Sequence, residues 1–157
     1  MRREKPWTAG VVTALAVAAI GTLSGARDAN AQQQPTNECS NATLRGSYGI
    51  QIQGTRPAPG GATESVIGVV IRHYAGDGTF TQIGNVKGSI TGLTPNAFAS
   101  GIVQVNGDCT ATVIVSAGGL NIEDRLVIVD SGRTLLGVTT QPAPVMITGI
   151  HKKIDVD

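Results

Sequence analysis

The sequence predicts an all-β fold, an antiparallel up-and-down β-barrel of about eight strands. Three observations indicate this class: β-branched residues in two-residue alternation, turn signals rich in Gly, Asn and Asp, and no apolar repeat of helical period. Short antiparallel strands leave exposed edges unless the sheet closes or doubles over. We favour a barrel over the alternative β-sandwich because hairpin follows hairpin without long crossovers, and 21 glycines allow tight bends.

The expected strands cover most of the chain after a polar segment. They lie at 46–54, 63–74, 79–90, 97–105, 109–117, 120–130, 134–140 and 145–152. The connections at 75–78, 106–108 and 131–133 carry the Gly, Asn and Asp of hairpin turns. The longest connection, 55–62, has two prolines and two glycines, so we expect it to be the most mobile loop. The strand at 63–74 is apolar in both phases, so both its faces should be partly buried.

Residues 1–31 have the order of an export signal and are expected to be removed. A basic start is followed by an apolar run at 9–23 and then by Ala29-Asn30-Ala31, which suits a signal peptidase. The alternative is a membrane anchor, but the apolar run is shorter than the roughly 20 residues that span a bilayer. We therefore expect a secreted or periplasmic protein with a polar lead-in at 32–41 and one barrel domain at 42–157.

Composition excludes several classes of function. The chain is 41% hydrophobic, which is too apolar for a disordered tail, and its formal net charge is only +1. Removal of residues 1–31 takes away four basic and two acidic side chains, which leaves a net charge of −1. We expect no nucleic-acid partner and, after signal cleavage, no membrane partner, because no strong basic run remains. The oligomeric state is left open.

Two cysteines remain after signal removal, and they are expected to form a disulfide between Cys39 and Cys109. Closing about 70 residues would stabilise the fold by roughly 4 kcal/mol in the chain-entropy treatment. The alternative is a metal or redox site, but the sequence has no Cys-x-x-Cys motif and only two histidines. We expect no metal and no cofactor.

Several segments resemble one family across nearly all of the mature chain. They are CSNATLRGSYGIQIQGT at 39–55, GDGTFT at 76–81, NGDCTATVIV at 106–115, VIVDSGRTLLGV at 127–138 and VMITGIHKK at 145–153. They look like small secreted bacterial proteins with an allene-oxide-cyclase-like, calycin-type barrel. The resemblance implies a barrel that acts as a cyclase, as a scaffold-type coupling protein or as a binder of apolar molecules.

Five residues are candidates for a functional site. Asp124 is in phase with apolar residues and is a candidate acid–base group, unless a bulge or register change turns it to solvent. His73 is the second catalytic candidate, with Tyr48 or Tyr74 as a hydrogen-bond partner, unless it only occupies the rim. Tyr48 and Tyr74 are also candidate ligand contacts. Glu64, beside the 55–62 loop, is a candidate ligand contact, with simple solvation as the alternative.

Three functions remain open from the sequence. The leading one is binding of a small apolar molecule, which predicts a cavity of a few hundred cubic ångströms with few polar groups. The second is a cyclase or isomerase, which needs an acid–base group that points inward. The third is a structural or surface-interaction protein with a solid interior and an exposed apolar patch. An enzyme is the less favoured reading.

Overall fold

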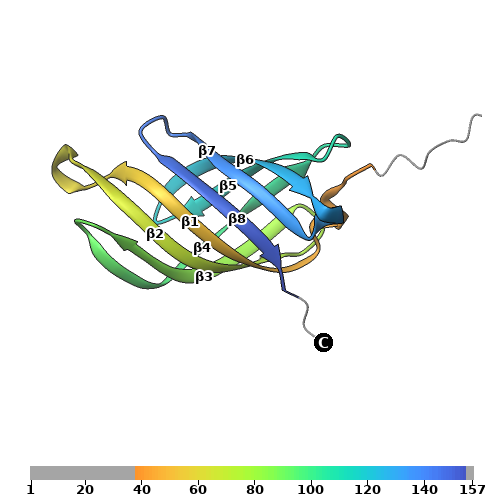
Figure 1. Cartoon of the computed structure of the whole chain (residues 1–157), viewed down its shortest axis with the longest axis horizontal. Coiled ribbons are helices and arrows are strands. Elements are labelled where there is room, and N and C mark those ends of the chain that lie inside the picture. Colours follow the sequence, from red (N-terminus) through yellow and green to blue (C-terminus); the bar gives the residue numbers. More distant parts are fainter. Residues whose placement is uncertain (1–37, 155–157) are drawn as a thin grey trace, which may run out of the picture. The chain divides into compact units, whose positions relative to one another are not determined.

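The computed structural model describes residues 38–154, which form a closed barrel of eight strands (Figure 1). Each strand pairs antiparallel with the next, and β8 pairs with β1. The elements are β1 (Gly46–Pro57), β2 (Thr63–Tyr74), β3 (Thr79–Gly88), β4 (Gly92–Val105), β5 (Thr110–Ala117), β6 (Leu120–Val129), β7 (Thr134–Gln141) and β8 (Met146–Lys153), with short 3-10 turns η1 (Asn41–Leu44), η2 (Pro59–Gly61) and η3 (Asp130–Gly132). The predicted barrel is confirmed, whereas the expected signal peptide lies outside the described residues.

Strand alternation separates an inner from an outer face all around the barrel. On β2, Val66, Val70 and Arg72 are buried, whereas Ile67 and Val69 between them are 60% and 61% exposed. The expectation that both faces of this strand are partly buried is therefore wrong. A closed single-layer barrel has one interior, so the outward phase of a strand stays in solvent whatever its composition.

The β3–β4 hairpin contains the largest departure from the expected strand limits. We expected a connection at 91–96, but β4 already begins at Gly92. A bulge allows this: Gly84 pairs with Ala97 and Val86 with Thr94, so Pro95 and Asn96 face the single residue Asn85. Asn96 takes a left-handed φ of 52°, which asparagine tolerates better than most residues. The bulge places Pro95 inside a strand without the loss of a regular ladder bond.

The connection between β1 and β2 is shorter than the sequence suggested. β1 continues to Pro57, and Thr55, Arg56 and Pro57 pair with Ser65, Glu64 and Thr63. The loop is thus reduced to 58–62, most of it the turn η2.

One end of the barrel is closed by the chain that precedes β1. The expected disulfide is present, with the Cα atoms of Cys39 and Cys109 5.0 Å apart. Next to it, η1 buries Leu44 completely. Tyr48 is also fully buried, and its hydroxyl donates a hydrogen bond to the carbonyl oxygen of Gly132. This end therefore has a packed, crosslinked core.

Aromatic rings continue this packed core along the barrel interior. The Tyr48 and Tyr74 rings meet edge to face with centroids 5.4 Å apart, and Phe80 packs on Tyr74 at 5.6 Å. Gly101 provides space for Phe80, because a Cβ at that position would overlap both the Phe80 ring and the carbonyl oxygen of Ile114. Burial of each such large side chain contributes roughly 1.5–3 kcal/mol to folding.

Candidate functional site

A cavity of about 100 Å³ lies inside the barrel beyond the aromatic rings. Most of its lining is aliphatic: Ile50, Ile52, Val70, Val115, Ile122, Leu126, Val138 and Ile147, with Gly137 and Gly149. Five polar side chains complete it: Arg72, Gln82, Asp124, Thr139 and His151. They come from five strands, so only closure of the barrel brings them together. An apolar pocket with a few convergent polar groups is the usual form of a ligand site.

Arg72 holds a positive charge within this interior. It points inward from β2 and is only 4% exposed. Its Nε donates to Oε1 of Gln82 at 2.7 Å, and its Nη1 donates to the Tyr74 hydroxyl at 3.1 Å. The guanidinium carbon lies 4.3 Å from the centroid of the Phe80 ring, a cation–π contact. Among the described residues, no carboxylate forms an ion pair with Arg72.

Asp124 points into the same cavity from β6. A bulge does occur here, as one of the sequence alternatives proposed, but it does not turn Asp124 to solvent. The extra residue is Thr140 on β7, since Glu123 pairs with Gln141 and Asp124 pairs with Thr139. The Thr139 hydroxyl donates to Oδ1 of Asp124 at 2.7 Å. Burial raises the pKa of Asp124, as expected for a carboxyl group removed from water.

His151 is the third ionisable group of the cavity. It projects inward from β8 opposite Ile50 and Leu135 and is 4% exposed. Burial, with a further contribution from the charge of Arg72, lowers the pKa of His151 to about 3, so the imidazole is neutral at physiological pH. Its Nδ1 is buried and has no hydrogen-bond partner among residues 38–154. An orphaned buried nitrogen is costly, and it marks a position where a bound group could form a hydrogen bond.

The sequence prediction identified Asp124 but missed Arg72, Gln82, Thr139 and His151. A signal for two of them was present in the strand pattern. Arg72 shares a phase with Val66 and Val70, and His151 shares one with Ile147. Once that phase is assigned to the interior, both residues become buried polar groups.

The two tyrosine candidates lie beside the cavity, in the packed end. Tyr74 reaches the site through its hydroxyl, which accepts from Arg72, and burial raises its pKa. Tyr48 does not line the cavity, and its hydroxyl donates a hydrogen bond to the carbonyl oxygen of Gly132. Burial raises the pKa of Tyr48 to about 12. Both hydroxyls therefore stay protonated in the physiological range.

His73 and Glu64 are placed elsewhere. His73 is on the outer face of β2, exposed, with its Nδ1 3.2 Å from the Ser47 hydroxyl, so it does not line the cavity. Glu64 is 1% exposed and ties the β1–β2 and β3–β4 hairpins together. Its carboxylate accepts from Arg56 at 2.7 Å and from the backbone N–H groups of Ile90 and Thr91. The N–H of Thr91, followed by Arg56, lowers the pKa of Glu64 to about 2.

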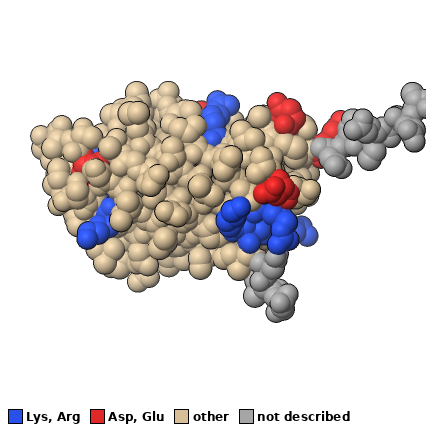
Figure 2. All heavy atoms as spheres, viewed as in Figure 1, with Lys and Arg blue, Asp and Glu red and all other residues tan. Residues whose placement is uncertain are grey.

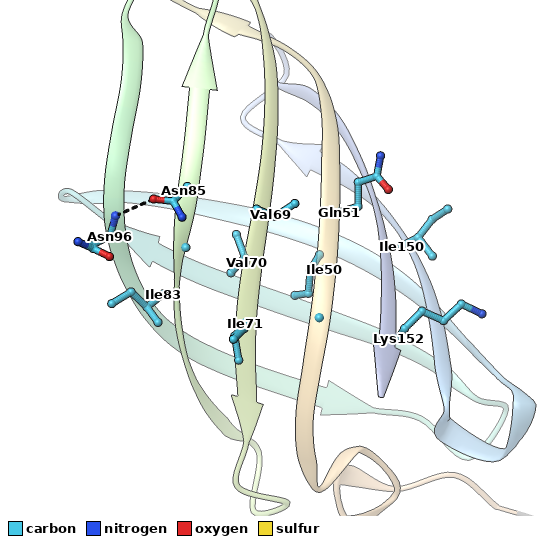
Figure 3. Close-up of a pocket in the computed structure, with 12 residues that line it drawn as sticks. Ile50, Gln51, Val69, Val70, Ile71, Ile83, Asn85, Asn96, Ile150 and Lys152 are labelled. Atoms are coloured by element: carbon cyan, nitrogen blue, oxygen red, sulfur yellow. Dashed lines mark hydrogen bonds between the residues drawn. The ribbon is translucent and has the colours of Figure 1, made fainter. Parts of the chain in front are cut away.

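A second hollow lies on the outer surface over β1, β2, β3, β4 and β8 (Figure 3). Its exposed apolar side chains include Val69, Ile71, Ile83 and Ile150. Lys152 also lines this hollow, but much of the face shown in Figure 2 is free of Lys, Arg, Asp and Glu. The barrel thus has an exposed apolar patch on its outer surface, whereas the one buried side-chain atom without a hydrogen-bond partner in the described part of the chain, Nδ1 of His151, lies in the interior.

Comparison of the sequence with protein-family models and with curated proteins finds no match. The resemblance to allene-oxide-cyclase-like proteins therefore stays a prediction. Within the part of the chain that is described, no helix is long and apolar enough to cross a membrane.

Proposed function

We propose that this barrel binds a small, mainly apolar molecule in its interior cavity. The observation that carries the proposal is the combination of an aliphatic wall with a buried polar atom, Nδ1 of His151, that no residue from 38 to 154 satisfies. Protein interiors are otherwise close-packed, and buried polar atoms are almost always hydrogen-bonded. A ligand that fills the cavity would remove the empty space, and its hydrogen bonds to the polar side of the cavity would satisfy the unpaired polar atom.

The cavity differs from the sequence expectation in size and in polarity. We expected a few hundred cubic ångströms with few polar groups, whereas its volume is about 100 Å³ with five polar side chains. An engineered apolar cavity of roughly 150 Å³ holds benzene. The enclosed part of the ligand is therefore smaller than benzene, about four non-hydrogen atoms at the same filling. The cavity also contradicts the solid interior expected of a purely structural barrel, although the exposed apolar patch of that hypothesis is present.

We propose a secreted or periplasmic location for this binding activity. The disulfide between Cys39 and Cys109 supports it, because such bonds persist in oxidising compartments. The export signal expected at residues 1–31 lies outside the described residues and remains a prediction.

A blocking variant tests whether the cavity is the binding site. Gly149 lines the cavity, and a Cβ there would make only ordinary contacts, the nearest at 3.4 Å to Nε2 of His151. Gly149→Leu should fill the space. Gly107→Leu is the matched control, because Gly107 lies in an exposed turn with no atom within 4 Å of its added Cβ.

Native mass spectrometry of protein purified from its own cell envelope gives the readout. We expect a bound small molecule on the original chain and on the Gly107→Leu variant, and none on Gly149→Leu. A chain that carries no small molecule, or equal occupancy in the Gly149→Leu variant, would contradict the proposal.

An isomerase or cyclase is the second candidate function. It is favoured by Asp124, which lines the cavity and whose pKa is raised by burial. A carboxyl group with a raised pKa can accept a proton from a bound substrate and return it. The test is Asp124→Asn, with binding and turnover of lipophilic compounds measured separately. Loss of turnover with binding retained supports this function, whereas unchanged turnover removes Asp124 from the reaction.

A further inference from the structure

The cavity contains a buried positive charge that no side chain neutralises by direct contact. The structure gives Arg72 two hydrogen bonds, both to neutral groups, and these use Nε and Nη1. Nη2 takes part in neither bond. A guanidinium stays charged in proteins, and a buried charge is costly unless it is paired. Stacking on Phe80 offsets part of this cost.

From this imbalance we propose that the polar group of the ligand is a carboxylate, held by Arg72 and His151. The inference rests on the proposed binding function and names its ligand class. Nη2 of Arg72 can donate to one carboxylate oxygen, and the Nδ1–H tautomer of neutral His151 can donate to the other. The aliphatic wall then surrounds a short hydrocarbon segment. The ligand class is a small aliphatic carboxylic acid, or the carboxyl end of a longer one.

Asp124 makes this site responsive to protonation. The charged and titratable groups that interact with it are Arg72 and Tyr74 from β2 and Glu123 adjacent on its own strand, and Thr139 from β7 donates its hydrogen bond. An ionised Asp124 would repel a bound carboxylate, whereas a protonated one would not. Binding of the anion therefore favours the protonated form of Asp124. Asp124→Asn imitates that form and keeps an oxygen to accept from the Thr139 hydroxyl.

The test compares butyrate with butanamide, which has nearly the same shape and no charge. Titrations are followed at pH 7 by methyl NMR of the cavity isoleucines Ile50, Ile52 and Ile147. We expect butyrate to bind about tenfold more tightly, because hydrogen bonds between charged partners are about twice as strong as neutral ones. Asp124→Asn should tighten butyrate binding several-fold and so increase the preference for butyrate over butanamide. Arg72→Met should remove the preference for butyrate.

The outcomes separate this inference from the proposed function. Equal affinity for butyrate and butanamide would contradict the inference that the ligand is a carboxylate but not the proposed binding function. A neutral molecule found by mass spectrometry would have the same consequence. Failure of both probes to shift the cavity methyl signals, together with the absence of any co-purified molecule, overturns both proposals. The test does not depend on Arg72→Met, because the probe comparison and Asp124→Asn decide the question in chains that keep Arg72.

Discussion

The two parts of the barrel interior follow opposite rules of construction. At the closed end, Leu44, Tyr48 and Tyr74 are fully buried, the rings interlock and a disulfide crosslinks the chain. In the cavity, Arg72 is buried without an ion pair, and Nδ1 of His151 has no partner among the described residues. The closed end is tightly packed, whereas the cavity holds polar groups that can still bond to a ligand. Burial of such groups lowers the stability of the fold. This division indicates that stability and binding are assigned to different parts of one barrel.

Loss of the crosslink should be the largest single change. Replacement of both Cys39 and Cys109 by serine opens a loop with a sequence separation of 70. The chain-entropy treatment gives a loss of about 4 kcal/mol in the free energy of unfolding. Urea unfolding followed by circular dichroism measures it, with the unmodified protein under reducing conditions as a second route to the same state. A loss below about 1 kcal/mol would show that the closed end does not depend on the crosslink.

Truncation of the residue that seals this end should have the next largest effect. Leu44→Ala removes a fully buried side chain from η1 and should cost about 3.5 kcal/mol, the middle of the range for such cavities. The matched control is Ile67→Ala on the outer face of β2, where the side chain is 60% exposed and the cost should be below about 1 kcal/mol. Equal losses in the two variants would mean that the closed end is not the main source of stability.

His151→Phe should make the fold more resistant to acid, in contrast to the two destabilising variants above. The pKa of the buried imidazole is about 3, against 6.5 for the free group, so the unfolded chain binds the proton first as pH falls. The stability linked to His151 is therefore complete above about pH 7 and is lost as the pH falls from 6.5 toward 3. At pH 5 the loss amounts to about 2 kcal/mol.

The measurement is a set of urea transitions at pH 8 and pH 5. The Phe variant should lose about 2 kcal/mol less than the original protein between these values. His73→Gln serves as the control, because His73 is exposed on the outer face and should leave the difference unchanged. Parallel pH profiles for His151→Phe and the original protein would place the imidazole in water rather than in the cavity.

The closed end was easier to predict from the sequence than the cavity. Hairpin signals depend on residues adjacent in the chain, and all eight strands were found from them. The pairing of Cys39 with Cys109 followed from the cysteine count, since only these two remain after signal removal. The ends of β1 and β4 were missed because Pro57 and Pro95 are tolerated at a strand end and at a bulge.

The cavity could be predicted only in part because it depends on which strand phase faces inward. Asp124 was found from its apolar neighbours on one strand. Arg72 and His151 required the interior phase of two further strands, and β2 is apolar in both phases. Ile67, Val69 and Ile71 are exposed but share a phase with His73. This apolar phase therefore indicated His73, rather than Arg72, as the inward-facing residue. Only the register of the closed sheet resolves the choice.

Removal of a single hydroxyl from the closed end should produce the smallest effect that remains informative. In Tyr48→Phe the ring keeps its edge-to-face contact with Tyr74, but the carbonyl oxygen of Gly132 loses its donor. A net loss of about 1 kcal/mol is expected for a buried neutral hydrogen bond. Urea unfolding at pH 7 measures it, and carboxylate binding in the cavity should not change. A large fall in butyrate affinity in this variant would show that the two regions are coupled, and the division of labour between them would then be wrong.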